Sequence, residues 1–295
     1  MTDIRRAYVR VARILPMAWP AQRIYLKTSE KEYRMYLHQE ETIKNITEKL
    51  KKRDDVLGLL VAGSIAHGFA TETSDVDIMI LISDENYNLR LQSGEMTYYE
   101  TESSTYKDGY VDGKYICMDF MKKVAEYGSE PARFAFEGSR LIFSKIDGVR
   151  DLIDRIVRYP VEKKTENIKR FRAQLEAWKW YYNEAIKHNN EYLLTIAISN
   201  LVLFGGRILL AYNETLYPYH KWFLKVLEGT KNKPDNTMKL IEDIYDSKDG
   251  MSVEAFCNSI TSFVHFEADG FNWPNQFAVD TELAWMNGLV PVSDI

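Results

Sequence analysis

The sequence predicts an α+β fold, in which a mixed sheet with flanking helices is followed by an α-helical bundle. The apolar run 56–62 is short enough to be a buried strand. In the run 75–82, side chains of a strand would alternate between two faces, with Asp75 and Asp77 on one of them. Beyond Pro160 the pattern changes, and apolar residues recur at three- and four-residue spacing, which is typical of helices.

The first apolar run ends at Gly63-Ser64. A helix that begins near Ser64 would leave unpaired backbone N–H groups at its N-terminus, and Gly63 has no side chain to hold an anion away from them. This corner of the chain therefore predicts a phosphate site.

Asp75 and Asp77 begin the second predicted strand and share one of its faces. Val76, Ile78 and Ile80 point the other way, and their burial would fix the register of the strand. Two carboxylates this close repel each other unless a cation lies between them, and Mg²⁺ bound to substrate phosphates is the usual solution. The pair therefore predicts a nucleotide-bound metal.

The order Gly-Ser, short helix and Ser-Asp-x-Asp resembles the signature of the nucleotidyltransferase-fold superfamily, the DNA polymerase beta-like group. The resemblance covers residues 56–121 and is only architectural across 160–295. Stand-alone bacterial enzymes that modify aminoglycoside or lincosamide antibiotics are the most similar members. The resemblance implies that a nucleoside monophosphate, AMP from ATP above all, is transferred from a nucleoside triphosphate to a hydroxyl of a small molecule. Pyrophosphate would be the leaving group.

The resemblance also implies roles for single residues. Asp75, Asp77 and a third carboxylate from a later strand would bind two Mg²⁺ ions, and Asp119 in the run 114–121 fits that third place. Whether Asp119 only binds metal or also accepts the proton of the attacking hydroxyl stays open. The residues expected to bind the triphosphate are Gly63, Ser64, Ser74 and Lys221, with Lys179 as a second nominee for the last position. His67 stands where relatives often carry arginine, so either a phosphate contact or a plain surface position is open to it.

Three segments are predicted along the chain. Residues 1–30 form a basic extension, because Pro16 and Pro20 argue against a helical organelle presequence. Residues 31–159 form the catalytic domain and residues 160–295 a helical substrate-binding domain. Helices are expected at 32–52, 162–188, 193–212, 219–228, 236–247, 253–266 and 277–285, and further strands at 96–102 and 140–144.

Composition excludes several classes of protein. With 45% hydrophobic and 27% charged residues, the chain is an ordinary globular protein, and no apolar run is long enough to predict a membrane span. Two widely separated cysteines suggest a reducing compartment, so a cytoplasmic location is expected. The net charge of -5 argues against an extended nucleic-acid surface.

Two alternatives to small-molecule transfer remain. The first is nucleotidylation of a protein or tRNA, which would require a basic groove leading away from the catalytic strand. The second is a nucleotide-binding module of the same fold without turnover. The sequence gives no sign of the oligomeric state.

Overall fold

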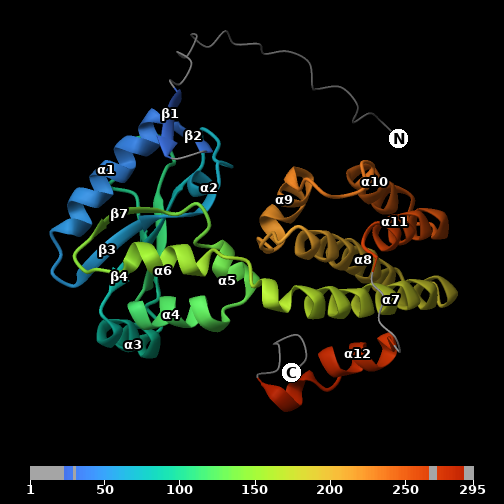
Figure 1. Cartoon of the computed structure of the whole chain (residues 1–295). Helices are drawn as coiled ribbons and strands as arrows, with labels where there is room; N and C mark the ends of the chain where they lie inside the picture. Colours follow the sequence, from blue (N-terminus) through green and yellow to red (C-terminus); the bar gives the residue numbers. More distant parts are fainter. Residues whose placement is uncertain (1–22, 29–30, 266–270, 289–295) are drawn as a thin grey trace, which may run out of the picture. The chain divides into compact units, whose positions relative to one another are not determined.

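The computed structural model describes residues 23–28, 31–265 and 271–288. The chain divides into two compact units (Figure 1). Residues 1–116 and 138–145 form the first, and residues 117–137 and 146–295 form the second. The first unit contains both sheets, and the described residues of the second form helices and connecting loops without a strand. The functional boundary near residues 159 and 160 stays a prediction.

The larger sheet of the first unit has five strands in the order β5-β6-β4-β3-β7. Its central pair, β4 and β6, is parallel, whereas the other neighbours are antiparallel. Together with the helical second unit, this mixed sheet confirms the predicted α+β class. The strands are β3 (Val56–Val61), β4 (Val76–Ile82), β5 (Thr97–Glu100), β6 (Val111–Ile116) and β7 (Arg140–Ser144).

Helix α1 (Leu37–Lys51) covers one face of this sheet (Figure 1). Ile46 and Leu50 on the helix and Ile80 on β4 are fully buried in one apolar cluster, and removing this area from water stabilises the packing. The predicted helix starts five residues too early, because β2 (Lys31–Tyr36) pairs with β1 (Arg23–Thr28) and both are extended. Part of the predicted basic extension therefore forms a strand, and residues 1–22 and 29–30 lie outside the described residues.

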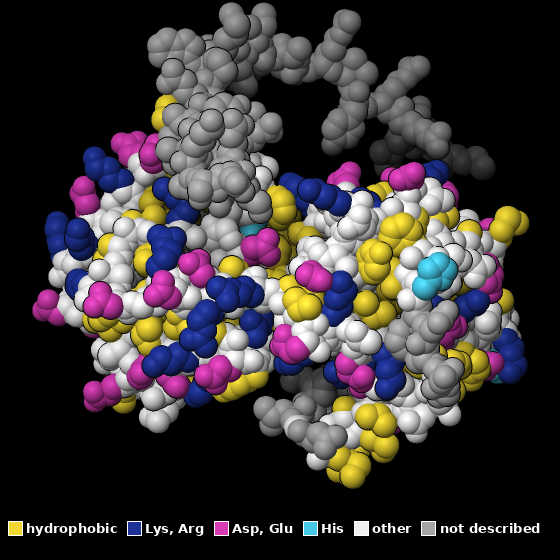
Figure 2. Space-filling model, in the orientation of Figure 1, with side chains coloured by type: hydrophobic (Ala, Val, Ile, Leu, Met, Phe, Trp, Pro, Cys, Tyr) yellow, Lys and Arg dark blue, Asp and Glu magenta, His cyan; other side chains and the backbone are white. Residues whose placement is uncertain are grey.

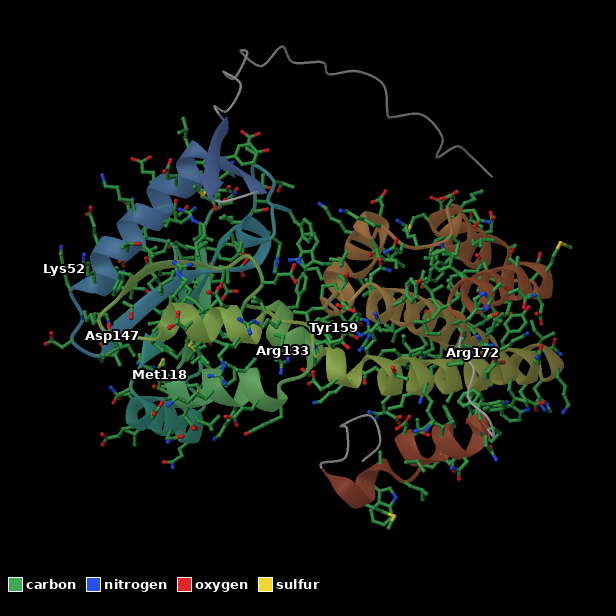
Figure 3. All side chains as sticks on the ribbon, viewed as in Figure 1. Lys52, Met118, Arg133, Asp147, Tyr159 and Arg172 are labelled. Atoms are coloured by element: carbon green, nitrogen blue, oxygen red, sulfur yellow. The ribbon has the colours of Figure 1, made fainter. Side chains whose placement is uncertain are left out.

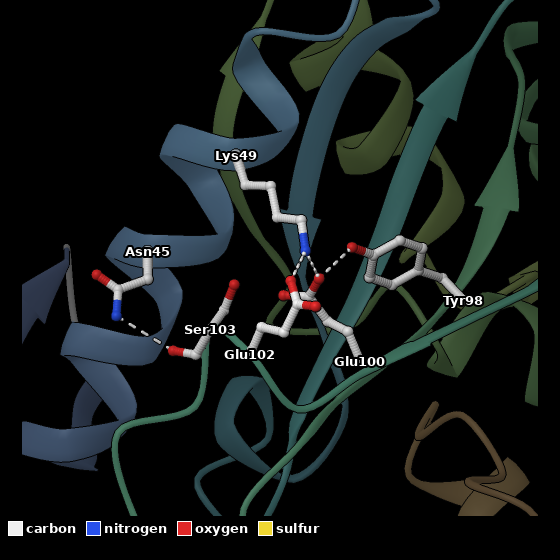
Figure 4. A network of polar contacts seen from close by, with 6 residues as sticks. All are labelled: Asn45, Lys49, Tyr98, Glu100, Glu102 and Ser103. Carbon is white, nitrogen blue, oxygen red and sulfur yellow. Dashed lines mark hydrogen bonds and ion pairs between the residues drawn. The ribbon is translucent and has the colours of Figure 1, made fainter.

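A charged network fixes which side chains of strand β5 point toward helix α1 (Figure 4). Lys49 of α1 pairs with Glu100 of β5, and it also lies 2.8 Å from Glu102. The hydroxyl of Tyr98 donates to the same Glu100 carboxylate at 2.8 Å. Since Tyr98 and Glu100 both point toward α1, the intervening Tyr99 points to the opposite face of the sheet.

The second unit is built around helices α7 (Lys164–Lys187) and α8 (Glu191–Tyr212). Helix α8 is long and apolar enough to span a bilayer by length and composition, yet it forms much of this unit's core. Gly205 and Gly206 allow neighbouring side chains to approach closely, because a Cβ atom at either position would lie under 3 Å from a phenylalanine ring. The other elements described after residue 160 are η1 (Val161–Lys163), η2 (His220–Trp222), α9 (Phe223–Gly229), α10 (Thr237–Ser247), α11 (Gly250–Phe263), α12 (Trp273–Asp280) and η3 (Ala284–Asn287).

Four further helices lie between β4 and η1. They are α3 (Asp84–Ser93), α4 (Met118–Tyr127), α5 (Glu130–Phe134) and α6 (Val149–Ile156). The guanidinium group of Arg133, labelled in Figure 3, joins the last three of them. It donates to the carbonyl oxygens of Gly128, Ile156 and Ala125 at 2.9 to 3.1 Å, so α4, α5 and α6 form one packed group.

The charged network between α1 and β5 can be tested by Lys49→Met. The change leaves the buried carboxylate of Glu100 without its cation, which costs roughly 1–3 kcal/mol of unfolding free energy. Because Lys49 lowers the pKa of Glu100 against the effect of burial, the stabilisation holds above the ordinary carboxyl pKa and is lost as the pH falls through the lowered value.

Urea denaturation at pH 7 and pH 4 would measure this effect. Lys52→Met is the matched control, because Lys52 is exposed at the end of α1 (Figure 3). Equal stabilities for the two variants at pH 7 would contradict the role given to Lys49.

Candidate active site

Three carboxylates meet at one end of strands β4 and β6. Oxygen atoms of Asp75, Asp77 and Asp112 all lie within 4.8 Å of one another. The parallel register places Asp112 of β6 directly beside Asp77 of β4, while Asp75 immediately precedes β4. The predicted Asp75/Asp77 pair on one face is therefore present, and a third carboxylate comes from the neighbouring strand.

Asp119 does not lie on a strand, contrary to the prediction. Strand β6 ends at Ile116, and the thiol of Cys117 accepts a hydrogen bond from the Phe120 N–H at 3.4 Å, which caps the following helix α4. Asp119 lies in the first turn of that helix, where it pairs with Lys123 at 2.7 Å. Asp112 of β6 instead stands third beside Asp75 and Asp77.

The Gly63 corner contacts the carboxylates directly. Gly63 has φ +59°, and a Cβ atom there would lie 1.8 Å from Oδ2 of Asp77, so only glycine fits. The N–H of Ser64 points to the same oxygen at 3.4 Å. The hydroxyl of Ser64 is buried and has no hydrogen-bond partner among the described residues. The corner therefore carries donor groups beside the metal-binding face.

The helix that follows this corner, α2 (Gly63–Ala66), has only four residues. The macrodipole of so short a helix is small. The predicted anion site therefore depends on Gly63 and on individual N–H and O–H donors, more than on a helix N-terminus. His67 caps the C-terminal end of α2, and its ring lies 5.8 Å from that of Phe69.

A tight turn before Asp75 holds the first carboxylate in place. The hydroxyl of Ser74 accepts a hydrogen bond from the N–H of Thr71 at 2.9 Å. The buried amide of Gln39 donates to the carbonyl oxygens of Thr71 and Ser74 at 2.9 and 3.1 Å. The Ser74 hydroxyl thus forms the turn, and its predicted contact with triphosphate stays a prediction.

The carboxylates influence the pKa values of two nearby tyrosines and one lysine. The negative charge of Asp75 and a hydrogen bond to it raise the pKa of Tyr110, as burial also does. Burial, followed by the charge of Asp75, raises the pKa of Tyr106 to about 12. Removal from water lowers the pKa of Lys114, and the nearby charge of Asp77 opposes that shift. Because Lys114 follows Asp112 by two positions on β6, it lies on the same face.

Comparison with known families agrees with this geometry. Residues 43–185 match the sequence pattern of the nucleotidyltransferase domain. This chain carries a nucleotidyltransferase domain. The matched region includes the Gly63 corner and all three clustered aspartates. No curated protein matches the sequence.

Two solved structures are similar to the chain as a whole. A nucleotidyltransferase-like protein from Exiguobacterium sibiricum is 10% identical, with a TM-score of 0.44, and the match covers 87% of this chain and 83% of that one. Spectinomycin adenyltransferase AAD(9) from Enterococcus faecialis, solved with ATP and spectinomycin, is 12% identical with a TM-score of 0.31, and the match covers 82% and 96%. With TM-scores below 0.5, these likenesses add nothing to the family match.

The two lysines nominated for the leaving group lie in the helical unit, outside the compact part that holds the carboxylates. Lys221 lies in η2, with its ammonium group 5.2 Å from the centre of the Trp222 ring. Lys179 forms an ion pair with Glu254 at 2.7 Å. Their predicted role in holding pyrophosphate stays a prediction.

The nucleotidyltransferase domain offers a donor set that suits a hard divalent cation. All ligand atoms of the cluster are carboxylate oxygens, the type that Mg²⁺ prefers. The Ser64 N–H points at Asp77, and the buried Ser64 hydroxyl, which has no hydrogen-bond partner among the described residues, would add a donor for a phosphate oxygen. Asp75, Asp77 and Asp112 are therefore the residues that would hold the metal.

Substituting Asp112 and Asp119 in turn distinguishes the structural assignment from the one made on sequence. Asp112→Asn removes one charged ligand and lowers the affinity for Mn²⁺ roughly ten-fold or more. Asp119→Asn leaves the affinity unchanged, because Asp119 lies on α4 and pairs with Lys123. Titration of Mn²⁺ followed by electron paramagnetic resonance measures both. A larger loss in the Asp119 variant would refute the assignment.

Proposed function

We propose that this chain is a Mg²⁺-dependent nucleotidyltransferase that transfers a nucleoside monophosphate to a hydroxyl of a small molecule. ATP is the expected donor, and an antibiotic of aminoglycoside or lincosamide type is the first acceptor class to test. The observation that supports this proposal most is the convergence of Asp75, Asp77 and Asp112 beside the Gly63 corner.

The donor side of the reaction follows from the groups at that corner. Asp75, Asp77 and Asp112 would hold the divalent cation, which when bound supplies charge neutralisation for the triphosphate oxygens. Gly63 lets a phosphate approach the backbone, and the N–H and hydroxyl of Ser64 would donate to its oxygens. These donors would hold the β- and γ-phosphates as the leaving group.

In the transfer step, the acceptor oxygen forms a bond to the α-phosphorus while the bond to the bridging oxygen of the β-phosphate breaks. The proton of the acceptor hydroxyl passes to a carboxylate, for which we nominate Asp112, and pyrophosphate leaves with the electron pair of the broken bond. The protein contributes little covalent chemistry and mainly positions the reactants. Gln39 and the turn at Ser74 would help by holding the backbone that carries Asp75.

The alternatives receive less support. Lys, Arg, Asp and Glu side chains are interspersed over the visible face in Figure 2, which does not favour a long basic groove for a nucleic acid. A module that only binds nucleotide has no evident need for three convergent carboxylates. Small-molecule transfer therefore remains the proposal.

The activity is tested by incubating purified protein with Mg²⁺, labelled ATP and a panel of aminoglycoside and lincosamide acceptors. Labelled nucleotide is expected on the acceptor, and Asp77→Asn lowers the rate roughly a hundred-fold or more, because one of the metal-binding carboxylates loses its charge. Lys52→Met serves as the control on overall integrity. Transfer that continues at the wild-type rate in Asp77→Asn would sink the proposal.

A second pair of variants separates the two serines. Ser64→Ala removes the unpaired hydroxyl of the corner and raises the KM for ATP roughly ten-fold, the effect of losing one hydrogen bond to a charged group. Ser74→Ala loosens the turn before Asp75, so it lowers kcat more than it raises KM. Steady-state kinetics with varied ATP measures both, and identical behaviour of the two variants would contradict this division of roles.

A further inference from the structure

One row of residues crosses the sheet through two of the three carboxylates, Asp112 and Asp77. The strand register pairs Tyr99 of β5 with Asp112 of β6, and Asp112 with Asp77 of β4. Ala62, which precedes the Gly63 corner, donates its N–H to the Asp77 carbonyl at 2.9 Å. The corner and strand β5 therefore lie on opposite sides of the carboxylates.

This order indicates the side from which the acceptor approaches, provided that the proposed function holds. In a phosphoryl transfer the attacking and leaving oxygens lie roughly in line on opposite sides of the phosphorus. If pyrophosphate leaves toward Gly63, the acceptor hydroxyl must approach from the side of Asp112 and β5. Whatever side chains β5 presents on this face are then available to the acceptor.

Strand β5 presents an aromatic surface there. The side chain of Tyr99 is 66% exposed, and its ring centre lies 5.4 Å from that of Tyr110 with the planes 36° apart. Tyr110 lies beside Asp75, because its carbonyl oxygen accepts the N–H of Val76, the residue after Asp75, at 3.1 Å. Tyr99 is directed to this face because its neighbours Tyr98 and Glu100 are fixed on the other one by Lys49 (Figure 4). Tyr99 and Tyr110 together are called the tyrosine shelf below.

An exposed tyrosine pair beside carboxylates is selective in its chemistry. The ring faces are apolar and electron-rich, so they suit the C–H face of a saturated ring, while the rigid side chains lose little entropy on binding. The negative carboxylates disfavour an acceptor that carries its own phosphates or carboxylates near the hydroxyl. A sugar or cyclitol ring meets both conditions.

We infer that the tyrosine shelf is the acceptor-binding surface and that the acceptor hydroxyl is carried on a sugar or cyclitol ring. Tyr99 supplies the stacking face. Tyr110 supplies a second face next to Asp75 and so lies where the acceptor side meets the metal-binding side. The donor nucleotide needs neither ring in this arrangement.

The inference is tested by saturation-transfer NMR on the full chain, with Mg²⁺ and α,β-methylene ATP present and no turnover required. The probes are methyl α-D-glucopyranoside and myo-inositol, with 1,4-butanediol as a hydroxyl compound that has no ring. Saturation is expected at the ring protons of the two cyclic probes and not on the diol. Tyr99→Ala lowers the affinity for the probes roughly two- to ten-fold, and Tyr99→Phe, which keeps the ring, does not.

Tyr192→Ala is the matched control, because Tyr192 is a 77% exposed tyrosine on α8 in the helical unit. The affinity for the ATP analogue, measured in the same samples, stays at its wild-type value in all three variants. Equal probe binding in Tyr99→Ala and wild type, or no probe binding at all, would overturn the acceptor role of the tyrosine shelf. The proposed donor site would be unaffected by either result. Weakened analogue binding in Tyr99→Ala would also overturn the acceptor role, since the shelf would then hold the nucleobase. Failure of the wild type to bind the analogue rejects the proposed function itself.

Discussion

Repulsion between three carboxylates is the interaction on which the rest of the site depends. At separations within 4.8 Å, each ionised pair repels by roughly 3 kcal/mol if the effective dielectric constant is about 20. Nothing in that local charge arrangement favours folding, so the sheet must enforce it. It does so through the pairing of β4 with β6 and through the buried row of Val76, Ile78 and Ile80, which keeps the acids on the other face. A cation bound between the three carboxylates would relieve the repulsion that the fold imposes on them.

The neighbouring features all reduce the freedom of those carboxylates. Gly63 approaches Asp77 so closely that no side chain fits, and the Ser64 N–H points at the same carboxylate. Gln39 of helix α1 fixes the turn before Asp75, and the carbonyl oxygen of Tyr110 accepts the N–H of Val76, the residue after Asp75. Because Asp75 and Asp77 are restrained by different segments, a nucleotide-bound metal would find these two ligands already in place, and little ordering cost would remain for them at binding.

The parts of this architecture that were predictable depend on local patterns. The apolar runs of β3 and β4 and the three- and four-residue spacing of α7 can each be recognised from residues that are close in sequence. Asp112 cannot, because Asp112-Gly113 reads locally as a turn, and only the register against β4 brings it beside Asp77. Asp119 was misplaced for a related reason: Cys117, an uncommon capping residue, ends the strand and starts α4. The pairing of β1 with β2 and the orientation of Tyr99 likewise depend on contacts distant in sequence.

That contrast explains why the donor half of the chemistry is easier to recognise than the acceptor half. Phosphate and metal binding need glycine, serine and aspartate at fixed short spacings, so one strand, one corner and the next strand contain most of the pattern. An acceptor has no such common group beyond its hydroxyl, and the side chains that meet it are selected by shape. In this chain they come from β5, whose direction is set by a lysine on α1 (Figure 4). The residue that orients the acceptor surface therefore never touches the acceptor, and no motif around Tyr99 would reveal the role we give it.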